Sequence, residues 1–425
     1  MYKGLIYDRN GLRKSTVIIE DGIITRIYDG IVNMSGEIVL DYSNYKSIVA
    51  FPGFIDLHVH LRDFNYAYKE TIESGTKAAV HGGITIVGDM PNTSPRIDNR
   101  SVLSKRIKLF REKSYADFYI YVDVSVENIS DVEDMLKNPH VAGIKLYPDK
   151  YYVLAYESIF HLLKKYNKLL IVHPEEPYLI NIFEEELIEQ IIKRDYHIEA
   201  IAVNHIGLVS EIHGLKRVHF THVTNPYSVL LSKRYGYTVD TCPHYLVFSY
   251  ERIIDNCKYK VLPPLRTEAH RSLLFNMLLS GNIDAVSSDH APHNVLEKIC
   301  CPMTCPPGIN GVEITAIYLG HLFSLGYLEL KDIYELLVFN PSRILNLKHY
   351  GNFSKGVRGN ISILNFGCTT CIKPDTLYTH AKYSIYDNMC FKSCVEATIV
   401  GGVLVYHRLK GIINKPNPVS LNDFS

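Results

Sequence analysis

The 425-residue sequence has no block of one charge sign and no long hydrophobic run. Lysine plus arginine and aspartate plus glutamate number 45 each, which argues against nucleic acid or an anionic membrane as the main partner. No apolar run approaches the roughly 18 residues of a membrane-spanning helix, and the first residues show no signal-peptide pattern. We therefore expect a soluble, cytoplasmic protein that binds neither nucleic acid nor a membrane.

The sequence also lacks the even cysteine pairing of a disulfide framework, because its nine cysteines are odd in number and scattered. This pattern predicts reduced thiols, as is typical of a cytosolic protein. Clusters occur at Cys300, Cys301 and Cys305, at Cys368 and Cys371, and at Cys390 and Cys394. A structural zinc site built from the later two pairs stays an alternative, although the sequence between them is more typical of strands than of a zinc knuckle.

Short apolar, β-branched runs alternate with longer helical patterns from residue 50 onward, which is typical of βαβ units and a parallel sheet. The predicted strands are Phe54–His58, Ile84–Met90, Phe118–Val126, Val141–Tyr147, Leu169–His173, Val218–Val223, Tyr237–Pro243 and Ile283–Asp289. The predicted helices include Lys69–His81, Val102–Arg111, Ser158–Tyr166, Ile180–Lys193 and Pro226–Arg234, and more helices follow over residues 311–346. Eight such strands predict an α/β fold of the (β/α)8, TIM-like barrel type.

The two ends of the chain differ from the middle, because they consist of short strands punctuated by Gly and Asp. Neither end is long enough to close a core alone, so we expect them to meet in one small discontinuous β-sandwich. The predicted organisation is residues 1–50 and 351–410 for the sandwich and 51–350 for the barrel. Residues 411–425, rich in Asn and Pro, are predicted to be a loose tail.

His58 and His60 close the first barrel strand at positions i and i+2, so both imidazoles point to the same face. Taken alone, such a pair is more often structural than metal-binding. Four further candidates also fall at predicted strand ends, where (β/α)8 enzymes build their active sites, namely Lys145, His173, His222 and Asp289. Imidazole and carboxylate groups suit zinc, so this joint placement predicts a metal site.

Lys145 requires a separate argument, because a protonated amine would repel a metal ion. A neutral lysine can react with carbon dioxide to give an anionic carbamate, whose two oxygens can bridge two metals. The alternative is a strand-end lysine paired with a carboxylate. Beside four histidines and an aspartate, the sequence favours the carbamate.

Several motifs together make the chain resemble the dihydroorotase family of the amidohydrolase superfamily over nearly its whole length. They are His58–Asp63 (HVHLRD), Tyr68–Thr71 (YKET), Gly82–Thr85 (GGIT), Asp89–Thr93 (DMPNT) and Ser288–His293 (SDHAPH). The resemblance implies a distorted barrel, a flanking β-sandwich and a binuclear zinc centre. His58, His60 and Asp289 would then bind one zinc, His173 and His222 the other, and carboxylated Lys145 would bridge them.

The resemblance also implies a set of substrate contacts. Arg62 would grip the substrate carboxylate, Asn92 and His293 would help to hold the carboxylate and the ring, and Pro307-Gly308 would touch the pyrimidine through the backbone. The alternatives are a surface salt bridge for Arg62 and a turn position for Asn92. Leu262 departs from the family, which usually has Asn or Arg there, and this puts substrate affinity in doubt.

The implied reaction is the reversible cyclisation of N-carbamoyl-L-aspartate to dihydroorotate in pyrimidine biosynthesis, with Asp289 as the proton shuttle. One alternative is another cyclic amidase, such as a hydantoinase or an allantoinase. A second is a non-catalytic subunit that partners aspartate carbamoyltransferase; such chains typically lose metal ligands, whereas all six candidates are present here. The sequence leaves open a homodimer and an association with that transferase.

Overall fold

A parallel sheet of eight strands forms the centre of the computed structural model, which describes residues 1–34, 36, 39–124, 129–180, 194–253, 257–299 and 304–420. The strands are β6 (Phe54–Val59), β7 (Ile84–Asp89), β8 (Asp117–Val122), β9 (Val141–Leu146), β10 (Leu169–Val172), β11 (Val218–Phe220), β12 (Thr238–Thr241) and β13 (Ala285–Val286). Each strand pairs with its neighbour in the chain. A parallel bridge between Val59 and His290 joins the two edges, so the predicted barrel is confirmed.

The strands of the barrel are largely apolar on both faces, as is typical of a parallel sheet. Every residue of β6, β7, β8 and β9 is buried, as expected where helices cover one face of a sheet and the barrel interior the other. The eight predicted strands are therefore confirmed, with ends that differ by a few residues. The last two residues predicted for the third strand, 125–126, lie outside the described residues.

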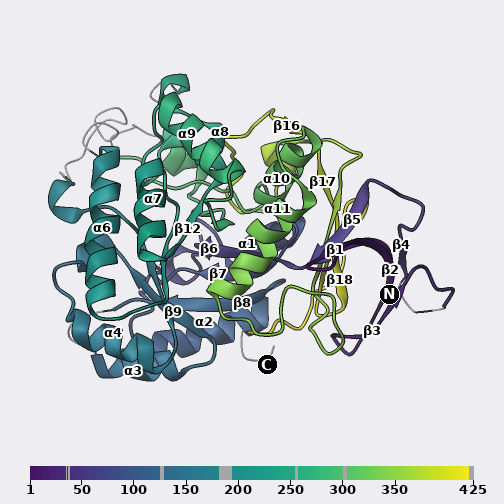
Figure 1. Cartoon of the computed structure of the whole chain (residues 1–425), viewed down its shortest axis with the longest axis horizontal. Helices are drawn as coiled ribbons and strands as arrows, with labels where there is room; N and C mark the ends of the chain where they lie inside the picture. The colour runs from purple at the N-terminus through teal and green to yellow at the C-terminus, as the bar shows by residue number, and fades with distance from the viewer. Residues whose placement is uncertain are drawn as a thin grey trace.

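Helices surround the barrel in Figure 1. They are α1 (Ile72–His81), α2 (Arg100–Lys113), α3 (Ile129–Lys137), α4 (Tyr156–Lys165), α6 (Tyr196–Ile212), α7 (Pro226–Tyr235), α8 (Pro243–Val247), α9 (Glu268–Leu279), α10 (Thr315–Ser324), α11 (Leu330–Tyr334) and α12 (Asn340–Ile344). Four of the five predicted helices are confirmed as α1, α2, α4 and α7. The fifth, Ile180–Lys193, lies outside the described residues except for its first position.

Both ends of the chain contribute to a second sheet of nine strands. Its strands are β1 (Tyr2–Asp8), β2 (Gly11–Glu20), β3 (Ile23–Asp29), β4 (Leu40–Asp41), β5 (Ile48–Pro52), β14 (Ile361–Asn365), β17 (Cys394–Val400), β18 (Val403–His407) and β19 (Gly411–Ile412). In Figure 1 the purple N-terminal and yellow C-terminal strands lie side by side at one end of the molecule. The prediction that both ends share one β unit is confirmed, whereas the exact domain boundaries stay predictions.

Residues 411–420 are attached to the barrel, which corrects the prediction of a loose tail over this stretch. The backbone N–H of Phe118 donates to Val419 O at 3.1 Å, and the N–H of Val419 donates to Asp117 Oδ1 at 2.8 Å. Ser420 forms a parallel bridge with Phe118. A backbone N–H and a side-chain carboxylate at the start of β8 therefore hold the tail in place.

The prediction of reduced thiols is wrong for six cysteines. The described residues include disulfides between Cys257 and Cys305, between Cys368 and Cys394, and between Cys371 and Cys390. The last of these joins the short strands β15 (Thr370–Cys371) and β16 (Cys390–Phe391). The alternative of a zinc site in this region is not supported, because the two disulfides leave no thiolate among these four residues.

Candidate active site

The six predicted metal ligands lie at one end of the barrel and line one cavity of about 490 Å³. His58 and Lys145 belong to β6 and β9, whereas His173 and His222 follow β10 and β11. Asp289 follows β13. Carboxyl ends of parallel strands share one rim, which is why residues more than two hundred positions apart meet here.

His58, His60 and Asp289 form a group of ligand atoms that could hold a metal ion, because these atoms all lie within 4.8 Å of one another. The Nε2 atoms of the two histidines are 3.1 Å apart, and Asp289 Oδ1 lies 3.3 and 3.2 Å from them. All three residues are buried. Three donor atoms converging on one point suit a tetrahedral metal ion such as zinc.

The second group consists of His173 and His222, whose ring centroids are 4.5 Å apart. His222 also lies beside His58, with a centroid separation of 5.2 Å, so the two groups adjoin. Burial, together with the positive charge of Lys145, lowers the pKa of His58 well below its usual value, and burial does the same for His222. Both imidazoles are therefore neutral at physiological pH, which is the form that binds metals.

Lys145 fits the requirements for a carbamate. Its side chain is 1% exposed, and its Nζ has no hydrogen-bond partner among the described residues. Burial lowers the pKa of Lys145 to about 7, so a substantial fraction of the amine is neutral near physiological pH. The alternative of an ion pair between Lys145 and a carboxylate is not supported, because the described part of the chain shows no such contact.

The predicted substrate contacts form another wall of the same cavity. Arg62 is buried, and its Nε donates to Pro292 O at 3.3 Å. His293 donates from Nε2 to Pro307 O at 2.9 Å, which ties the rim to the loop of Gly308. A side chain at Gly308 would collide with Ala291 O, so this loop can approach the cavity only with glycine. Arg62 is thus not a surface residue.

Asn92 has a contact that the sequence did not predict. Its Oδ1 lies 2.6 Å from His60 Nδ1, so the carboxamide oxygen accepts from this imidazole nitrogen. This leaves His60 Nε2 for the metal side and the Asn92 amide N–H groups for a substrate. Asn92 therefore links the metal group to the substrate wall.

Glu175 was missed by the sequence reasoning although it lies only two residues after His173. Its Oε2 is 2.7 Å from His173 Nε2 and 2.6 Å from a guanidinium nitrogen of Arg194. Burial alone would raise the pKa of Glu175, but Arg194 and the hydrogen bond from His173 bring it down to about 2. A carboxylate here fixes the orientation of the His173 ring.

Left-handed backbone conformations occur at three of the site residues. Arg62, His222 and Asp289 have φ angles of 44°, 45° and 44°. Such values are uncommon for residues other than glycine and are found where the surroundings enforce them, often at functional sites. The left-handed backbone of these three residues therefore costs conformational energy, which the surrounding contacts of the rim must offset.

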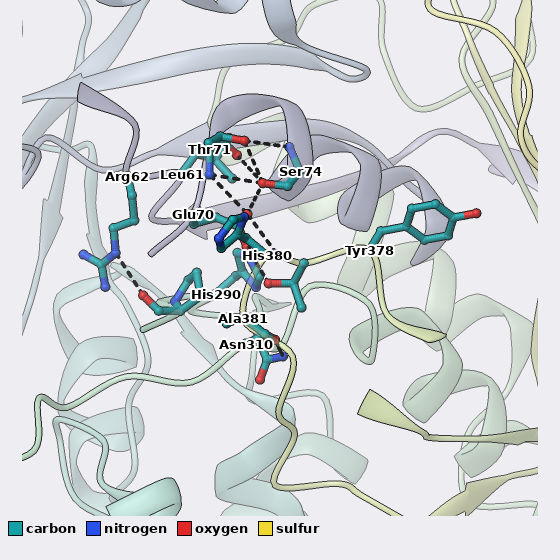
Figure 2. A network of polar contacts seen from close by, with 12 residues as sticks. Leu61, Arg62, Glu70, Thr71, Ser74, His290, Asn310, Tyr378, His380 and Ala381 are labelled. Carbon is teal, nitrogen blue, oxygen red and sulfur yellow. Dashed lines mark hydrogen bonds and ion pairs between the residues drawn. The ribbon is translucent and has the colours of Figure 1, made fainter. Parts of the chain in front are cut away.

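Figure 2 shows a network of polar contacts centred on Glu70, to one side of Arg62. The buried Glu70 carboxylate accepts from Thr379 Oγ1 at 2.5 Å and from the His380 backbone N–H at 3.2 Å, and it lies 3.4 Å from His290 Nε2. Because His290 directly follows Asp289, Glu70 connects the metal rim to a segment near the C-terminus. The sequence reasoning quoted Glu70 within a motif but gave it no role.

A family model for amidohydrolases matches residues 49–405. A dihydroorotase of Sulfolobus acidocaldarius is 37% identical over 327 residues, which are 76% of each chain. A dihydroorotase of Pyrococcus furiosus is 34% identical and is covered over 90% of its length, with 94% of this chain aligned. The chain belongs to the dihydroorotase family of amidohydrolases. The resemblance seen in the motifs is thereby confirmed.

Solved structures of similar fold include an L-hydantoinase (dihydropyrimidinase) from Arthrobacter aurescens, with a TM-score of 0.88 at 21% identity and 98% coverage of both chains. A dihydropyrimidinase from Brevibacillus agri has a TM-score of 0.87 at 19% identity, covering 99% of this chain and 97% of its own. At these identities the likeness concerns the fold alone. It confirms the barrel with an additional β unit.

Membrane insertion through helices finds no support, since none of the helices in the described ranges has both the length and the apolar character of a membrane span.

Proposed function

We propose that this chain interconverts N-carbamoyl-L-aspartate and (S)-dihydroorotate, the ring closure that supplies pyrimidine biosynthesis. The observation that carries the proposal is one cavity that is lined by all six predicted metal ligands and by a buried arginine. Dihydroorotate has two groups that match these features. Its cyclic amide would be hydrolysed at the metal ligands, and its carboxylate would pair with the arginine. The membership of the family adds weight, because relatives that are 37% and 34% identical to this chain are dihydroorotases.

The residues present fit a pair of zinc ions. His58, His60 and Asp289 would hold one ion, His173 and His222 the other, and Lys145 would bridge them as a carbamate. The unpartnered, buried Nζ of Lys145 is the observation that supports the bridge. When bound, such a pair supplies an acidified water and a Lewis acid for the scissile carbonyl.

The chain's own residues orient the substrate and move the proton. The guanidinium of Arg62 would pair with the substrate carboxylate, and the amide N–H of Asn92 and the side chain of His293 would help to fix it. During hydrolysis the Asp289 carboxylate accepts a proton from the attacking water and delivers it to the departing ring nitrogen. During ring closure the same carboxylate takes the proton from the carbamoyl nitrogen as that nitrogen attacks the side-chain carboxyl carbon. It returns this proton to the carboxyl oxygen as the C–O bond breaks, and that oxygen takes a second proton from solvent to leave as water.

A second candidate is hydrolysis of another cyclic amide, such as a hydantoin, and Leu262 is the observation that favours it. Leucine lines the cavity where the family usually places a polar side chain, and it cannot donate a hydrogen bond. Arg62 argues against this candidate. Its buried guanidinium would have no anionic partner in a substrate that lacks a carboxylate. The alternative of a non-catalytic subunit is disfavoured because all six ligand residues are present.

Turnover assays on protein loaded with zinc and bicarbonate test the proposal. We expect dihydroorotate hydrolysis and N-carbamoyl-L-aspartate cyclisation, with much weaker activity on hydantoin or dihydrouracil. Protein that binds two zinc ions and hydrolyses a hydantoin, yet leaves dihydroorotate intact, would contradict it. A homodimer, an association with aspartate carbamoyltransferase and a cytoplasmic location stay predictions from the sequence.

A further inference from the structure

We propose that Asp240, which lies in the barrel interior outside the cavity lining, is a positioning residue for ligands of both zinc ions. The inference rests on the metal centre of the proposed function. Asp240 belongs to β12 and is fully buried. It acts through Thr221 on His58 and directly on the backbone of His222.

The side-chain contacts of Asp240 reach the two neighbouring strands, β11 and β13, or the segments that follow them. Its carboxylate accepts from the backbone N–H of His222 and from Thr221 Oγ1 at 3.1 Å. It also accepts from Ser287 Oγ at 2.8 Å, two residues before Asp289, and from His219 Nε2 at 2.9 Å. Four donors satisfy one buried charge, which offsets the cost of burying it.

Thr221 carries the effect of Asp240 to the ring of His58. A hydroxyl has one hydrogen, and Thr221 donates it to Asp240, so the same oxygen is an acceptor for His58 Nδ1 at 2.7 Å. His58 therefore carries its hydrogen on Nδ1. The lone pair of His58 Nε2 is then free for a metal ion. This atom lies 3.1 Å from His60 Nε2 and 3.3 Å from Asp289 Oδ1.

His222 receives a different kind of support. Its φ of 45° places the residue in the left-handed region, and the hydrogen bond from its backbone N–H to Asp240 helps to hold it there. His222 belongs to the second ligand group, whereas His58 belongs to the first. One carboxylate thus couples the geometry of the two groups.

The alternative is that Asp240 merely satisfies polar groups in the barrel interior, and Thr238 provides the comparison. Thr238 belongs to the same network, because its Oγ1 lies 2.9 Å from His219 Nδ1 and contacts Val218 O at 3.3 Å. Its hydroxyl reaches no metal ligand. The two roles therefore predict different zinc affinities. A positioning role predicts a loss of affinity in Thr221→Val but not in Thr238→Val, whereas a packing role predicts similar effects of both substitutions.

The experiment is a zinc titration of metal-free protein in bicarbonate against a chromophoric chelator, with zinc content from mass spectrometry and the melting temperature of the metal-free form. We expect Thr221→Val to weaken zinc binding at the site of His58, His60 and Asp289 by about 10- to 100-fold. This is the usual effect of removing the hydrogen-bond partner of a metal-binding histidine. Thr221→Ser should restore affinity. Thr238→Val should bind zinc like the wild type even if its melting temperature falls as far as that of Thr221→Val.

Asp240→Asn should weaken both sites, since it disturbs His58 and His222 together; if this variant does not fold, the threonine variants decide. Unchanged zinc affinity in Thr221→Val, or an equal loss in Thr238→Val, would overturn the inference. Neither measurement needs substrate, so a failure to turn over dihydroorotate would refute the proposed function without touching this result. Wild-type protein that binds no zinc would overturn the metal centre itself.

Discussion

At the residue scale, the amount of zinc bound should depend most on Lys145. Lys145→Ala should remove the bridging group and with it most of the bound zinc and activity, and short carboxylic acids should partly restore both. Zinc analysis and turnover measure this. The matched control is Lys168→Ala, a half-buried lysine whose Nζ donates to Asn138 O at 3.3 Å outside the cavity. Equal zinc loss in both variants would point to general destabilisation.

Arg62 should matter for recognising the substrate carboxylate. Arg62→Gln should weaken dihydroorotate binding by roughly 1.5–3 kcal/mol, the usual range for hydrogen bonds to a charged group. Binding of dihydrouracil, which has the ring without the carboxylate, should change little. Calorimetry with both compounds tests this, and equal losses for the two would show that Arg62 supports the loop through Pro292 instead.

Leu262 lines the cavity at a position where the resemblance to the family leads us to expect Asn or Arg. If dihydroorotate is the substrate, Leu262→Asn should leave turnover unchanged or improve affinity by about 0.5–1.5 kcal/mol, the net value of one neutral hydrogen bond. Steady-state kinetics on dihydroorotate and hydantoin decide the matter. If the variant loses a native hydantoin activity while gaining dihydroorotate turnover, the leucine belongs to a pocket for a more apolar substrate.

At the scale of elements, the Cys257–Cys305 disulfide joins the two loops that carry Leu262 and Pro307-Gly308. The backbone N–H of Gly308 also donates to Lys260 O at 2.9 Å, so the loops run side by side. Together they form one wall of the cavity. The link therefore ties the shape of the substrate wall to the oxidation state of two cysteines.

Cys257→Ser should lower the free energy of unfolding by about 2–4 kcal/mol, typical for loss of a native disulfide, and should raise KM for dihydroorotate. Cys371→Ser should lower stability as well but leave KM unchanged, because the Cys371–Cys390 link lies outside the substrate cavity. Denaturant unfolding and steady-state kinetics on both variants make the comparison. If KM of Cys257→Ser equals that of the wild type, the Cys257–Cys305 disulfide stabilises the fold without shaping the cavity.

At the scale of the whole molecule, Glu70 joins the barrel to the C-terminal part of the chain. Burial alone would raise its pKa, but the hydrogen bond and charge of His290, with the Ser74 and Thr379 hydroxyls, lower it overall. A carboxylate with a lowered pKa in the folded state adds stability that is present above its ordinary pKa, near 4.5, and is lost as the pH falls further.

Glu70→Gln should therefore reduce the free energy of unfolding at pH 7 by roughly 1–3 kcal/mol, as expected when buried partners are left unsatisfied. The same variant should show a shallower loss of stability below pH 4.5 than the wild type. Denaturant unfolding at a series of pH values measures both effects. Parallel acid curves for the two proteins would mean that folding does not lower the pKa of Glu70.

The predictability of the fold depended on local patterns. The eight barrel strands were predictable because each is a short apolar run between polar turns. Helix α6 was not predicted, and its exposed Ile201, Leu208 and Ile212 explain why, since apolar side chains on the outer face hide the helical period. The disulfide of Cys257 was also missed, because its partner lies 48 residues away and no local pattern marks it.

The sequence by itself determined which residue types stand at the strand ends, and hence that histidines, a lysine and an aspartate would face one cavity. Parallel strands place their carboxyl ends on a common rim, so this conclusion needs only the order of strands. Only the tertiary structure decided which imidazole nitrogen faces the metal side. That choice depends on Asn92, Thr221 and Glu175, whose hydrogen bonds to the ligands are set by strand register and packing.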